Sequence, residues 1–275
     1  MLLLVLKRET PLLIRIAFIL LLTGALDSLA LAEGLPVRAR IQTLTPFASP
    51  EGLDRLSRST AKTDFAPLAN QFEPQATIAF CAPATAAIVL NALDPQGVEA
   101  SHDRSRLTPA DTRYLPRGLE LTDRRYTQES VIAAGKKTRA QVLGEPMAVE
   151  GRMVRDGGYQ LRQLDELLRA YKVATKLVIV DAHTPEAEIR RDLVDNLQRG
   201  GDYVIVNYLR SAVGQAGGGH ISPVGAYDAA TDSVLILDVH PSHYPWLWMP
   251  LATLIQGMRT RDGAENRGYI LVRPR

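Results

Sequence analysis

Cysteine is nearly absent from this sequence, which has one, Cys81, in 275 residues. A single thiol cannot form an intrachain disulfide, and this excludes a small scaffold held together by disulfides. A lone cysteine without further context is most often a small buried hydrophobic residue. The role of Cys81 therefore has to be argued from the residues around it.

A large excess of charge of one sign is missing too. Lysine and arginine together number 32, aspartate and glutamate 30, and the formal net charge is +2. No basic stretch is interleaved with aromatic residues, so the usual signature of a nucleic-acid binder is not there. The sequence also has no internal repeat and no low-complexity linker, and its length suits one domain with a sizeable core.

Long apolar runs are scarce, and the one near the N-terminus is short. Residues 16–26 form an apolar run about half as long as the roughly 20 residues that span a bilayer. Lys7 and Arg8 precede this run, and Ala30 to Ala32 form an A-x-A cleavage site after it. We therefore interpret residues 1–32 as a signal peptide and 33–275 as the catalytic domain, and we predict export to the periplasm or the exterior of a bacterium. An uncleaved anchor is the alternative.

The pattern of apolar residues predicts an α+β fold in which a buried helix packs on an antiparallel sheet. Prolines interrupt residues 35–74, which we interpret as an irregular surface arm. Residues 81–93 are apolar nearly all round, which is typical of a helix buried on every side. Further helices are predicted over residues 126–134, 160–170, 185–197 and 251–258. Strands are predicted over residues 175–180, 203–209, 221–227, 234–239 and 268–272, the third and fourth as an antiparallel hairpin.

Cys81 is predicted to lie at the start of the buried helix. Pro83 fits a helix only in its first turn, so the helix begins within a residue or two of Cys81. Unpaired N–H groups and the helix dipole favour negative charge at that position. We therefore expect the pKa of the thiol to fall from about 8.5 toward the range of about 3.5–7.5, which makes Cys81 a nucleophile. Simple packing of the side chain is the alternative.

A histidine and an aspartate in the predicted hairpin are candidates for a base and its orienting acid. His220 follows three consecutive glycines, which let a backbone or a substrate approach closely. Asp238 lies in an otherwise apolar strand, where a carboxylate is costly without a partner. If Ala226 pairs with Val234, Asp238 lies opposite Ser222 on the same face as His220, within reach of a hydrogen bond. An unrelated buried aspartate and a surface histidine are the alternative.

Together, Cys81, His220 and Asp238 supply a nucleophile, a base and an orienting acid. The carboxylate would fix the imidazole tautomer, the imidazole would take the thiol proton, and the thiolate would attack a carbonyl carbon. Gln75, six residues before Cys81, is a candidate hydrogen-bond donor to the resulting oxyanion, together with the backbone N–H of Cys81. A loop residue without a catalytic role is the alternative for Gln75.

Three segments carry motifs around these residues. Residues 75–93 contain Gln-x5-Cys-x-Pro, residues 219–227 contain Gly-His-Ile-Ser-Pro, and residues 235–248 contain Ile-Leu-Asp-Val followed by Tyr-Pro and Trp. In this order the segments resemble those of the phytochelatin synthase family, and the similarity extends over most of residues 65–275. All three candidate catalytic residues fall on matching positions.

The resemblance implies a papain-like cysteine peptidase fold. It also implies that Cys81 attacks the Cys–Gly amide of glutathione, releases glycine and forms a γ-glutamylcysteinyl thioester, which passes to water or to a second glutathione. Asn207 and Arg210 match a stretch that lines the family's acyl pocket. Arg210 and Arg267 are candidates for holding the γ-glutamyl carboxylate, since guanidinium groups bind carboxylates through a paired fork. Two solvated surface arginines are the alternative.

The sequence departs from the family pattern after Asp238. Trp246 stands where the family has a second proline, and residues 240–243 largely replace its basic residues. The Cys-rich C-terminal region of the eukaryotic members has no counterpart in this sequence. We therefore expect hydrolysis of glutathione to γ-glutamylcysteine as the main reaction, ahead of phytochelatin synthesis.

Glutathione is the expected partner, and we expect no resident cofactor or metal. His240 and His243 offer two metal ligands, which are too few for a site, and heavy-metal ions such as cadmium would arrive as thiolate complexes of the substrate. No nucleic acid is expected as a partner, and no membrane after removal of the signal peptide; a homodimer stays an open question. Two other functions stay open: a papain-like peptidase acting on another γ-glutamyl or cell-wall peptide, and a non-catalytic module that binds glutathione–metal complexes.

Overall fold

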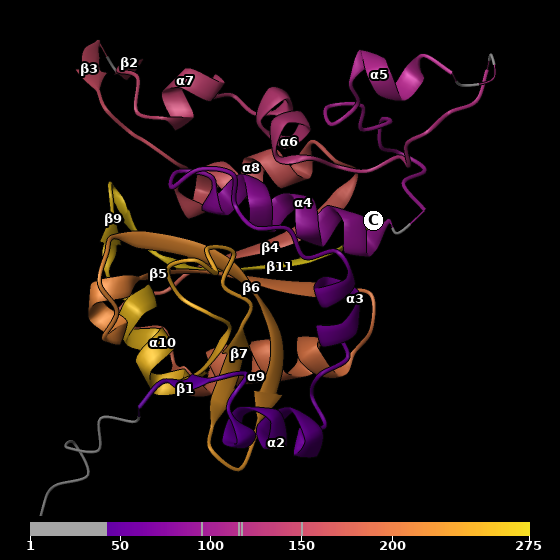
Figure 1. Ribbon diagram of the computed structural model, residues 1–275. Helices are drawn as coiled ribbons and strands as arrows, with labels where there is room; N and C mark the ends of the chain where they lie inside the picture. Colours follow the sequence, from indigo (N-terminus) through magenta and orange to yellow (C-terminus); the bar gives the residue numbers. More distant parts are fainter. Residues whose placement is uncertain (1–42, 95, 115, 117, 150) are drawn as a thin grey trace, which may run out of the picture. The chain divides into compact units, whose positions relative to one another are not determined.

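The computed structural model describes residues 43–275, apart from residues 95, 115, 117 and 150 (Figure 1). The predicted signal peptide, residues 1–32, lies outside the described residues. Among the helices that are described, none combines the length and the apolar character needed to cross a membrane.

A seven-stranded sheet forms the centre of the fold, and each pair of neighbouring strands in it is antiparallel. In order across the sheet, the strands are β1 (Thr45–Pro46), β8 (Leu247–Pro250), β7 (Ser233–Ile236), β6 (Gly219–Asp228), β5 (Tyr203–Leu209), β11 (Gly268–Pro274) and β4 (Val173–Ile179). Two small hairpins are separate from it: β2 (Met147–Val149) with β3 (Arg152–Val154), and β9 (Arg261–Asp262) with β10 (Glu265–Asn266).

Helices cover both faces of this sheet (Figure 1). One face carries α4 (Cys81–Leu93), α6 (Gln128–Ala134) and α8 (Leu161–Arg169); the other carries α9 (Glu186–Gln198) and α10 (Leu251–Met258). Alternate side chains of β5 enter the two cores, with Ile205 in the first and Val204 and Val206 in the second. Because both faces of β5 are covered, its sequence is apolar along nearly its whole length.

Several predicted elements are confirmed. The helices over 81–93 and 251–258 and the strand over 203–209 have the predicted bounds, and the other predicted helices and strands are present with bounds that differ by a few residues. The α+β class, with a buried helix packed on an antiparallel sheet, is confirmed as well. The prediction succeeds here because a helix or strand with a strong apolar period is determined mainly by local sequence.

The predicted irregular arm is wrong in part, since it contains α2 (Pro50–Arg58) and α3 (Phe65–Asn70). Ser49 caps α2 by accepting a hydrogen bond from the Gly52 N–H at 3.0 Å, and Pro50 occupies the first helical position. Three further short helices were not predicted: α5 (Pro109–Thr112), α7 (Arg139–Val142) and the 3-10 helix η2 (Arg210–Val213). The strands β1, β2, β3, β8, β9 and β10 were not predicted either. Proline breaks a helix in its interior but suits the first helical position, which Pro50 occupies here.

The β6–β7 hairpin differs from the predicted register near its turn. Ala226 pairs with Leu235 rather than with Val234. A bulge then absorbs one residue, so that Val224 pairs with Ile236, and from there the register is the predicted one. The strand ends at Ile236, and Asp238 lies two residues beyond it rather than inside a strand, as had been predicted.

Candidate active site

Cys81 is the first residue of α4, as predicted. Every residue from Ala82 to Asn91 is buried, so the helix that carries the thiol is packed on all sides. The Thr85 hydroxyl donates a hydrogen bond to the Ile221 carbonyl at 3.2 Å, which joins the first turn of α4 to strand β6. Phe80 precedes the helix and makes no side-chain capping hydrogen bond, and Pro83 in the first turn has no backbone N–H.

His220, on β6, is in contact with Asp238. Its Nε2 lies 2.9 Å from Oδ1 of Asp238 and 2.8 Å from the Ser222 hydroxyl oxygen. A neutral imidazole that donates from Nε2 to the carboxylate carries no proton on Nδ1. The hydrogen bond to Asp238 therefore selects the tautomer in which Nδ1 can accept a proton.

Arg210 lies against Asp238. One terminal nitrogen of its guanidinium is 2.9 Å from Oδ2 of Asp238, and the other donates to Oδ1 at 3.0 Å. The guanidinium also donates to Gln215 at 2.8 Å and lies over the ring of Tyr244, 4.7 Å from its centre. The structure therefore places the guanidinium of Arg210, predicted to bind the γ-glutamyl carboxylate, on a buried carboxylate of the protein, and Arg210 does not line the cavity that Cys81 lines.

These contacts decide the charges of Asp238 and His220. Burial alone would raise the pKa of Asp238, but the hydrogen bond and charge of His220, followed by those of Arg210, lower it to about 2. Burial lowers the pKa of His220 below its ordinary value, although Asp238 acts in the opposite direction. Near neutral pH the pair is therefore an uncharged imidazole held by a carboxylate.

The thiol of Cys81 does not have the expected low pKa. The residue is partly exposed, yet the sulfur is enclosed by protein on its other sides, and burial raises the pKa of the thiol. Backbone groups of Ile221 and Ala82, and the charge of Arg210, lower the pKa without overcoming burial. The prediction of a stable thiolate is therefore wrong for the ligand-free site, because desolvation outweighs the effect of the helix N-terminus.

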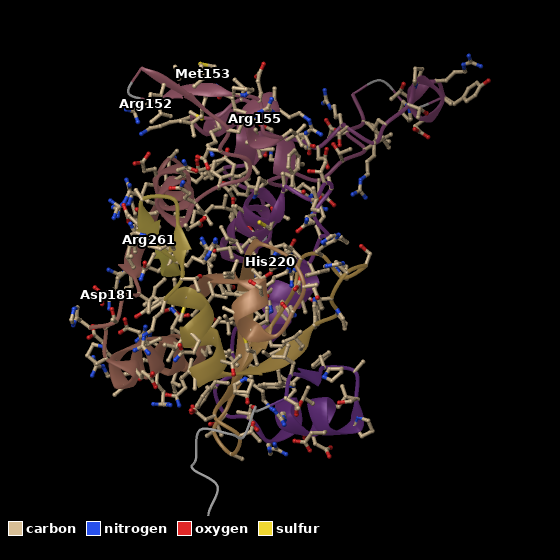
Figure 2. All side chains as sticks on the ribbon, turned by 90° about the vertical axis from the view of Figure 1, so that its left-hand side faces the viewer. Arg152, Met153, Arg155, Asp181, His220 and Arg261 are labelled. Atoms are coloured by element: carbon tan, nitrogen blue, oxygen red, sulfur yellow. The ribbon has the colours of Figure 1, made fainter. Side chains whose placement is uncertain are left out.

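Cys81 and His220 line one cavity of about 250 Å³. Figure 2 labels His220 on β6 and Arg261, the first residue of β9. Arg267 directly follows the β9–β10 hairpin in the sequence. The remaining lining residues are Ile78, Ala79, Gly157, Gly158, Tyr159, Asn207, Gly219, Ile221, Asp262 and Arg267. The cavity thus combines a nucleophile and a base with a charged wall and a glycine-rich wall.

The charged wall consists of Asn207, Asp262 and Arg267. A terminal nitrogen of Arg267 donates to Asn207 Oδ1 at 2.8 Å and to Asp262 Oδ2 at 2.9 Å, and Asn207 Nδ2 donates to the same Asp262 oxygen at 2.9 Å. Asn207 and Arg267 are thus in the cavity, as predicted, whereas Asp262 was not predicted. A wall with a guanidinium and a carboxylate side by side can bind a group that is itself both cationic and anionic.

Gly219 allows Arg267 to reach this wall. A Cβ atom on residue 219 would lie 2.3 Å from a terminal nitrogen of Arg267, closer than van der Waals contact permits. A side chain at residue 219 would therefore displace the Arg267 guanidinium from this wall, so Gly219 leaves room for a side chain of the protein as well as for substrate or backbone.

Gln75 is differently placed from its predicted role. Its side-chain Nε2 donates to the Thr77 carbonyl at 2.8 Å, and its backbone N–H donates to the Val239 carbonyl at 2.7 Å. Both contacts organise the loop that leads to Cys81, and Gln75 does not line the cavity. Of the two predicted donors to an oxyanion, the backbone N–H of Cys81 remains.

Three neighbours of the site were missed from the sequence. Ser222 contacts His220, Tyr208 stacks edge-on to the imidazole with ring centres 5.8 Å apart, and Asp262 completes the charged wall. Ser222 and Tyr208 follow from the register of β5, β6 and β7, since Tyr208 pairs directly with His220. No sequence motif identifies Asp262, because it lies in a short polar hairpin.

His240 and His243 stack on each other with ring centres 5.4 Å apart. Within the described residues, no group of three or more histidine, cysteine, aspartate or glutamate side chains is arranged to hold a metal ion. The two histidines are explained by this stacking and by the contact of His243 with Tyr244, whose ring centre is 4.6 Å away.

A family model described as phytochelatin synthase matches residues 38–109 and 116–269. The chain is 28% identical over 232 residues to glutathione gamma-glutamylcysteinyltransferase 3 of Lotus japonicus, a match that covers 82% of this chain and 41% of that protein. It is 46% identical over 72 residues to the transferase 1 of Triticum aestivum (26% of this chain, 14% of that protein) and 34% identical over 89 residues to the transferase of Schizosaccharomyces pombe (32% and 22%). The matched part of the chain thus spans less than half the length of each of these relatives.

Proposed function

Because the chain belongs to the phytochelatin synthase family, we propose that it is a cysteine-dependent enzyme that cleaves the Cys–Gly bond of glutathione to γ-glutamylcysteine and glycine. The names of its relatives, glutathione gamma-glutamylcysteinyltransferases, support glutathione as the substrate. A papain-like fold is part of the proposal, and family membership and the packing of α4 on an antiparallel sheet support it. Transfer of the γ-glutamylcysteinyl group to a second glutathione is the accompanying reaction.

In the acylation step, Nδ1 of His220 takes the thiol proton while the sulfur of Cys81 attacks the carbonyl carbon of the Cys–Gly amide. The imidazolium then returns that proton to the departing nitrogen, the C–N bond breaks, and glycine leaves with a neutral amine. Asp238 stabilises the imidazolium between the two transfers. The raised pKa of the thiol supports this order, in which the proton moves during the attack rather than before it.

In the deacylation step, the γ-glutamylcysteinyl thioester on Cys81 is attacked by water. His220 accepts a proton from the water and returns one to the sulfur, which regenerates the thiol. γ-Glutamylcysteine leaves with a new carboxylic acid group, which releases its proton to solvent. When the amino group of a second glutathione attacks instead of water, the product is a phytochelatin. Both outcomes use the same base and differ in the nucleophile.

Recognition of the γ-glutamyl group is assigned to the charged wall. This group carries an α-carboxylate and an α-ammonium, which suit the guanidinium of Arg267 and the carboxylate of Asp262 respectively. Asn207 holds both side chains in place through its amide, at 2.8 and 2.9 Å. For the oxyanion, the backbone N–H of Cys81 is the donor that the geometry favours, whereas Gln75 would first have to release the Thr77 carbonyl.

The observation that carries the proposal is that Cys81 and His220 line one cavity while Asp238 holds Nε2 of His220 at 2.9 Å. The test is mass spectrometry of the purified protein quenched during incubation with glutathione. We expect a γ-glutamylcysteinyl adduct on Cys81 and free glycine, and Cys81→Ser and Cys81→Ala variants that release none.

The same measurement separates the alternatives. A wild-type protein that binds glutathione without releasing glycine would be the binding module, and one that releases amino acids only from wall fragments would be the other peptidase. Export is also proposed, on the pattern of residues 1–32. Expression of the full chain followed by cell fractionation tests it: protein confined to the cytosolic fraction with an intact N-terminus would contradict export.

A further inference from the structure

The glycine-rich wall of the cavity is a short stretch of chain, residues 156–159, which we call the strap. Gly157, Gly158 and Tyr159 line the cavity together with Cys81, and none of the three has a charged side chain. Gly158 has φ +71°, a backbone conformation that side-chain-bearing residues rarely adopt. Its N–H donates to the Val142 carbonyl at 2.8 Å, so one point of the strap is attached to the end of α7.

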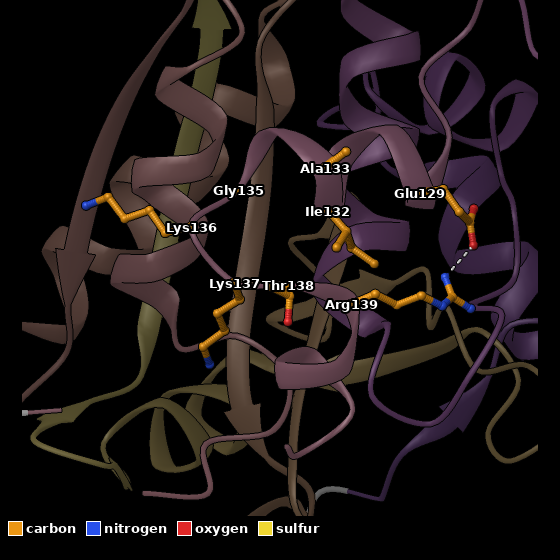
Figure 3. A pocket seen from close by; sticks show the side chains of 8 residues that line it. All are labelled: Glu129, Ile132, Ala133, Gly135, Lys136, Lys137, Thr138 and Arg139. Carbon is orange, nitrogen blue, oxygen red and sulfur yellow. Dashed lines mark hydrogen bonds and ion pairs between the residues drawn. The ribbon is translucent and has the colours of Figure 1, made fainter. Parts of the chain in front are cut away.

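Lys137 attaches the strap at two further points. Its ammonium donates to the Asp156 carbonyl at 2.7 Å, the Asp156 carboxylate at 2.8 Å and the Gly158 carbonyl at 2.9 Å. The residue is 4% exposed, and the three contacts use all three of its N–H donors. Figure 3 shows that its side chain and that of the adjacent Lys136 point in different directions. Lys137 is therefore a buried cation committed to the strap.

The hydrogen bonds from Lys137 determine where the backbone N–H groups of the strap point. In a trans peptide the N–H is antiparallel to the preceding C=O, and the described residues contain no cis peptide. Since the carbonyls of Asp156 and Gly158 point at Lys137, the N–H groups of Gly157 and Tyr159 point away from it. Lys137 does not line the cavity, whereas Gly157 and Tyr159 do. Neither N–H has a hydrogen bond to another described residue.

We propose that the strap is a substrate-binding element, in which the N–H groups of Gly157 and Tyr159 donate to carbonyl or carboxylate oxygens of the peptide substrate and Lys137 is the positioning residue that holds them. The inference rests on the proposed function, since it takes glutathione as the peptide. The charged wall binds the γ-glutamyl end, and the strap binds main-chain oxygens along the cavity, as one strand binds another. Lys137 acts through the strap and contacts no reacting atom.

The test compares steady-state glycine release by the wild type, Lys137→Met and the matched control Lys136→Met. Lys136 is the neighbouring lysine, its side chain is 85% exposed, and it pairs with Glu166 at the surface. Loss of two well-aimed donors should raise KM for glutathione about tenfold or more in Lys137→Met. The value of kcat should stay within about threefold, because the strap contacts substrate and transition state alike. Lys136→Met should match the wild type.

Two further measurements separate a displaced strap from a damaged fold. Alkylation of Cys81 by iodoacetamide, a reagent too small to need the strap, should proceed at the wild-type rate in Lys137→Met. If this variant does not fold, Asp156→Asn replaces it; that change keeps both carbonyl contacts, so the rise in KM should be smaller and in the same direction. An unchanged KM in a folded variant, or equal losses of kcat and of alkylation rate, would overturn the proposal.

A comparison of two substrates identifies which substrate oxygen the strap binds. Glutathione is compared with the analogue in which the glycine carboxylate is an amide. If the Lys137→Met effect on KM persists with the amide, the strap binds an amide carbonyl, and if it disappears, the strap binds the carboxylate. If the wild type releases no glycine, the proposed function fails, and the strap is tested by measuring whether glutathione protects Cys81 from alkylation by iodoacetamide. Protection in the wild type that is lost in Lys137→Met supports the strap. Equal protection in both proteins, or no protection in the wild type, overturns it.

Discussion

Arg210 and Asp238 form a buried ion pair whose carboxylate is shared with His220. The guanidinium approaches both oxygens of Asp238, at 2.9 and 3.0 Å, and the imidazole Nε2 lies 2.9 Å from one of them. The side chains of Arg210 and Asp238 are 5% and 0% exposed, so neither charge is solvated by bulk water. The carboxylate that orients the imidazole is therefore held ionised by a cation on its other side.

Removal of this cation should affect both folding and activity. In Arg210→Met the Asp238 carboxylate keeps His220 but loses its charged partner, and breaking a buried pair costs about 3–5 kcal/mol of unfolding free energy. We also expect glycine release to fall, because the pKa of Asp238 rises and its hold on the imidazolium weakens. Urea denaturation and steady-state kinetics measure the two effects. The double variant Arg210→Met/Asp238→Asn should regain stability and stay inactive; a double variant as unstable as the single one would contradict the pairing.

Asp238→Asn tests the selection of the imidazole tautomer. An asparagine can donate to Nε2 and thereby leave the proton on Nδ1, where it blocks acceptance of the thiol proton. By analogy with other triads, kcat should fall by about 10²–10⁴-fold. The substrate pocket is untouched, so glutathione should still protect Cys81 from alkylation. A variant with kcat close to the wild type would show that Asp238 does not orient the base.

Alkylation of Cys81 should report a thiol rather than a preformed thiolate. Burial raises the pKa of Cys81 and lowers that of His220. In the ligand-free site, the thiol and the imidazole are therefore both uncharged at pH values between these two pKa values. The rate of reaction with iodoacetamide should therefore rise with pH into the alkaline range and show no plateau below neutral pH. A plateau extending to acidic pH would demonstrate a thiolate–imidazolium pair and would contradict the neutral assignment.

Stability should fall as the solution is acidified, for a reason that can be assigned to the site. His220 has a lowered pKa in the folded protein, so its contribution is complete above the unfolded value of about 6.5 and is lost as pH falls below it. Asp238, at about 2 when folded, adds a second loss below about pH 4. Unfolding free energies of the wild type and His220→Gln at several pH values measure this. The two should diverge less at pH 5 than at pH 7; parallel curves would assign the acid sensitivity to other groups.

Trp246 should stabilise the N-terminal arm. Its ring packs among Phe72, Phe47 and Phe65, with ring centres 4.9, 5.7 and 6.1 Å away. This cluster joins α3 and the β1–α2 turn to the segment after Asp238. Trp246→Ala should lower the unfolding free energy by about 2–3 kcal/mol, since the side chain is only half-buried. Its kcat, measured well below the melting temperature, should change little; a large loss of kcat with unchanged stability would place Trp246 in the site instead.

Part of the site could be read from the sequence because it depends on local features. Pro83 and the all-apolar run after it predict where α4 begins, and so they place Cys81 at a helix N-terminus. The glycine before His220 and the isolated charge of Asp238 identify two more residues. Their contact needed the hairpin register, which was predicted with an error at the turn, and the bulge between Val224 and Ala226 compensated for that error.

Other features were out of reach of such reasoning because they depend on which distant segments meet. Arg210 looked free to bind a substrate carboxylate until the fold placed it 28 positions away in sequence against Asp238. Asp262 and the strap held by Lys137 have no motif. The direction of the thiol pKa depends on how completely the surrounding chain excludes water from the sulfur, which no local pattern records.

The sequence by itself determined five of the described helices, five of the seven strands of the central sheet, the family and the order of the three candidate catalytic residues. These follow from side-chain periodicity and from residues adjacent in the chain. Only the tertiary structure decided which cations and carboxylates pair, how the cavity is walled and whether the thiol is charged. The physical reason is that hydrogen bonding, desolvation and Coulomb interactions act over a few ångströms in space, between groups that the chain brings together from positions far apart.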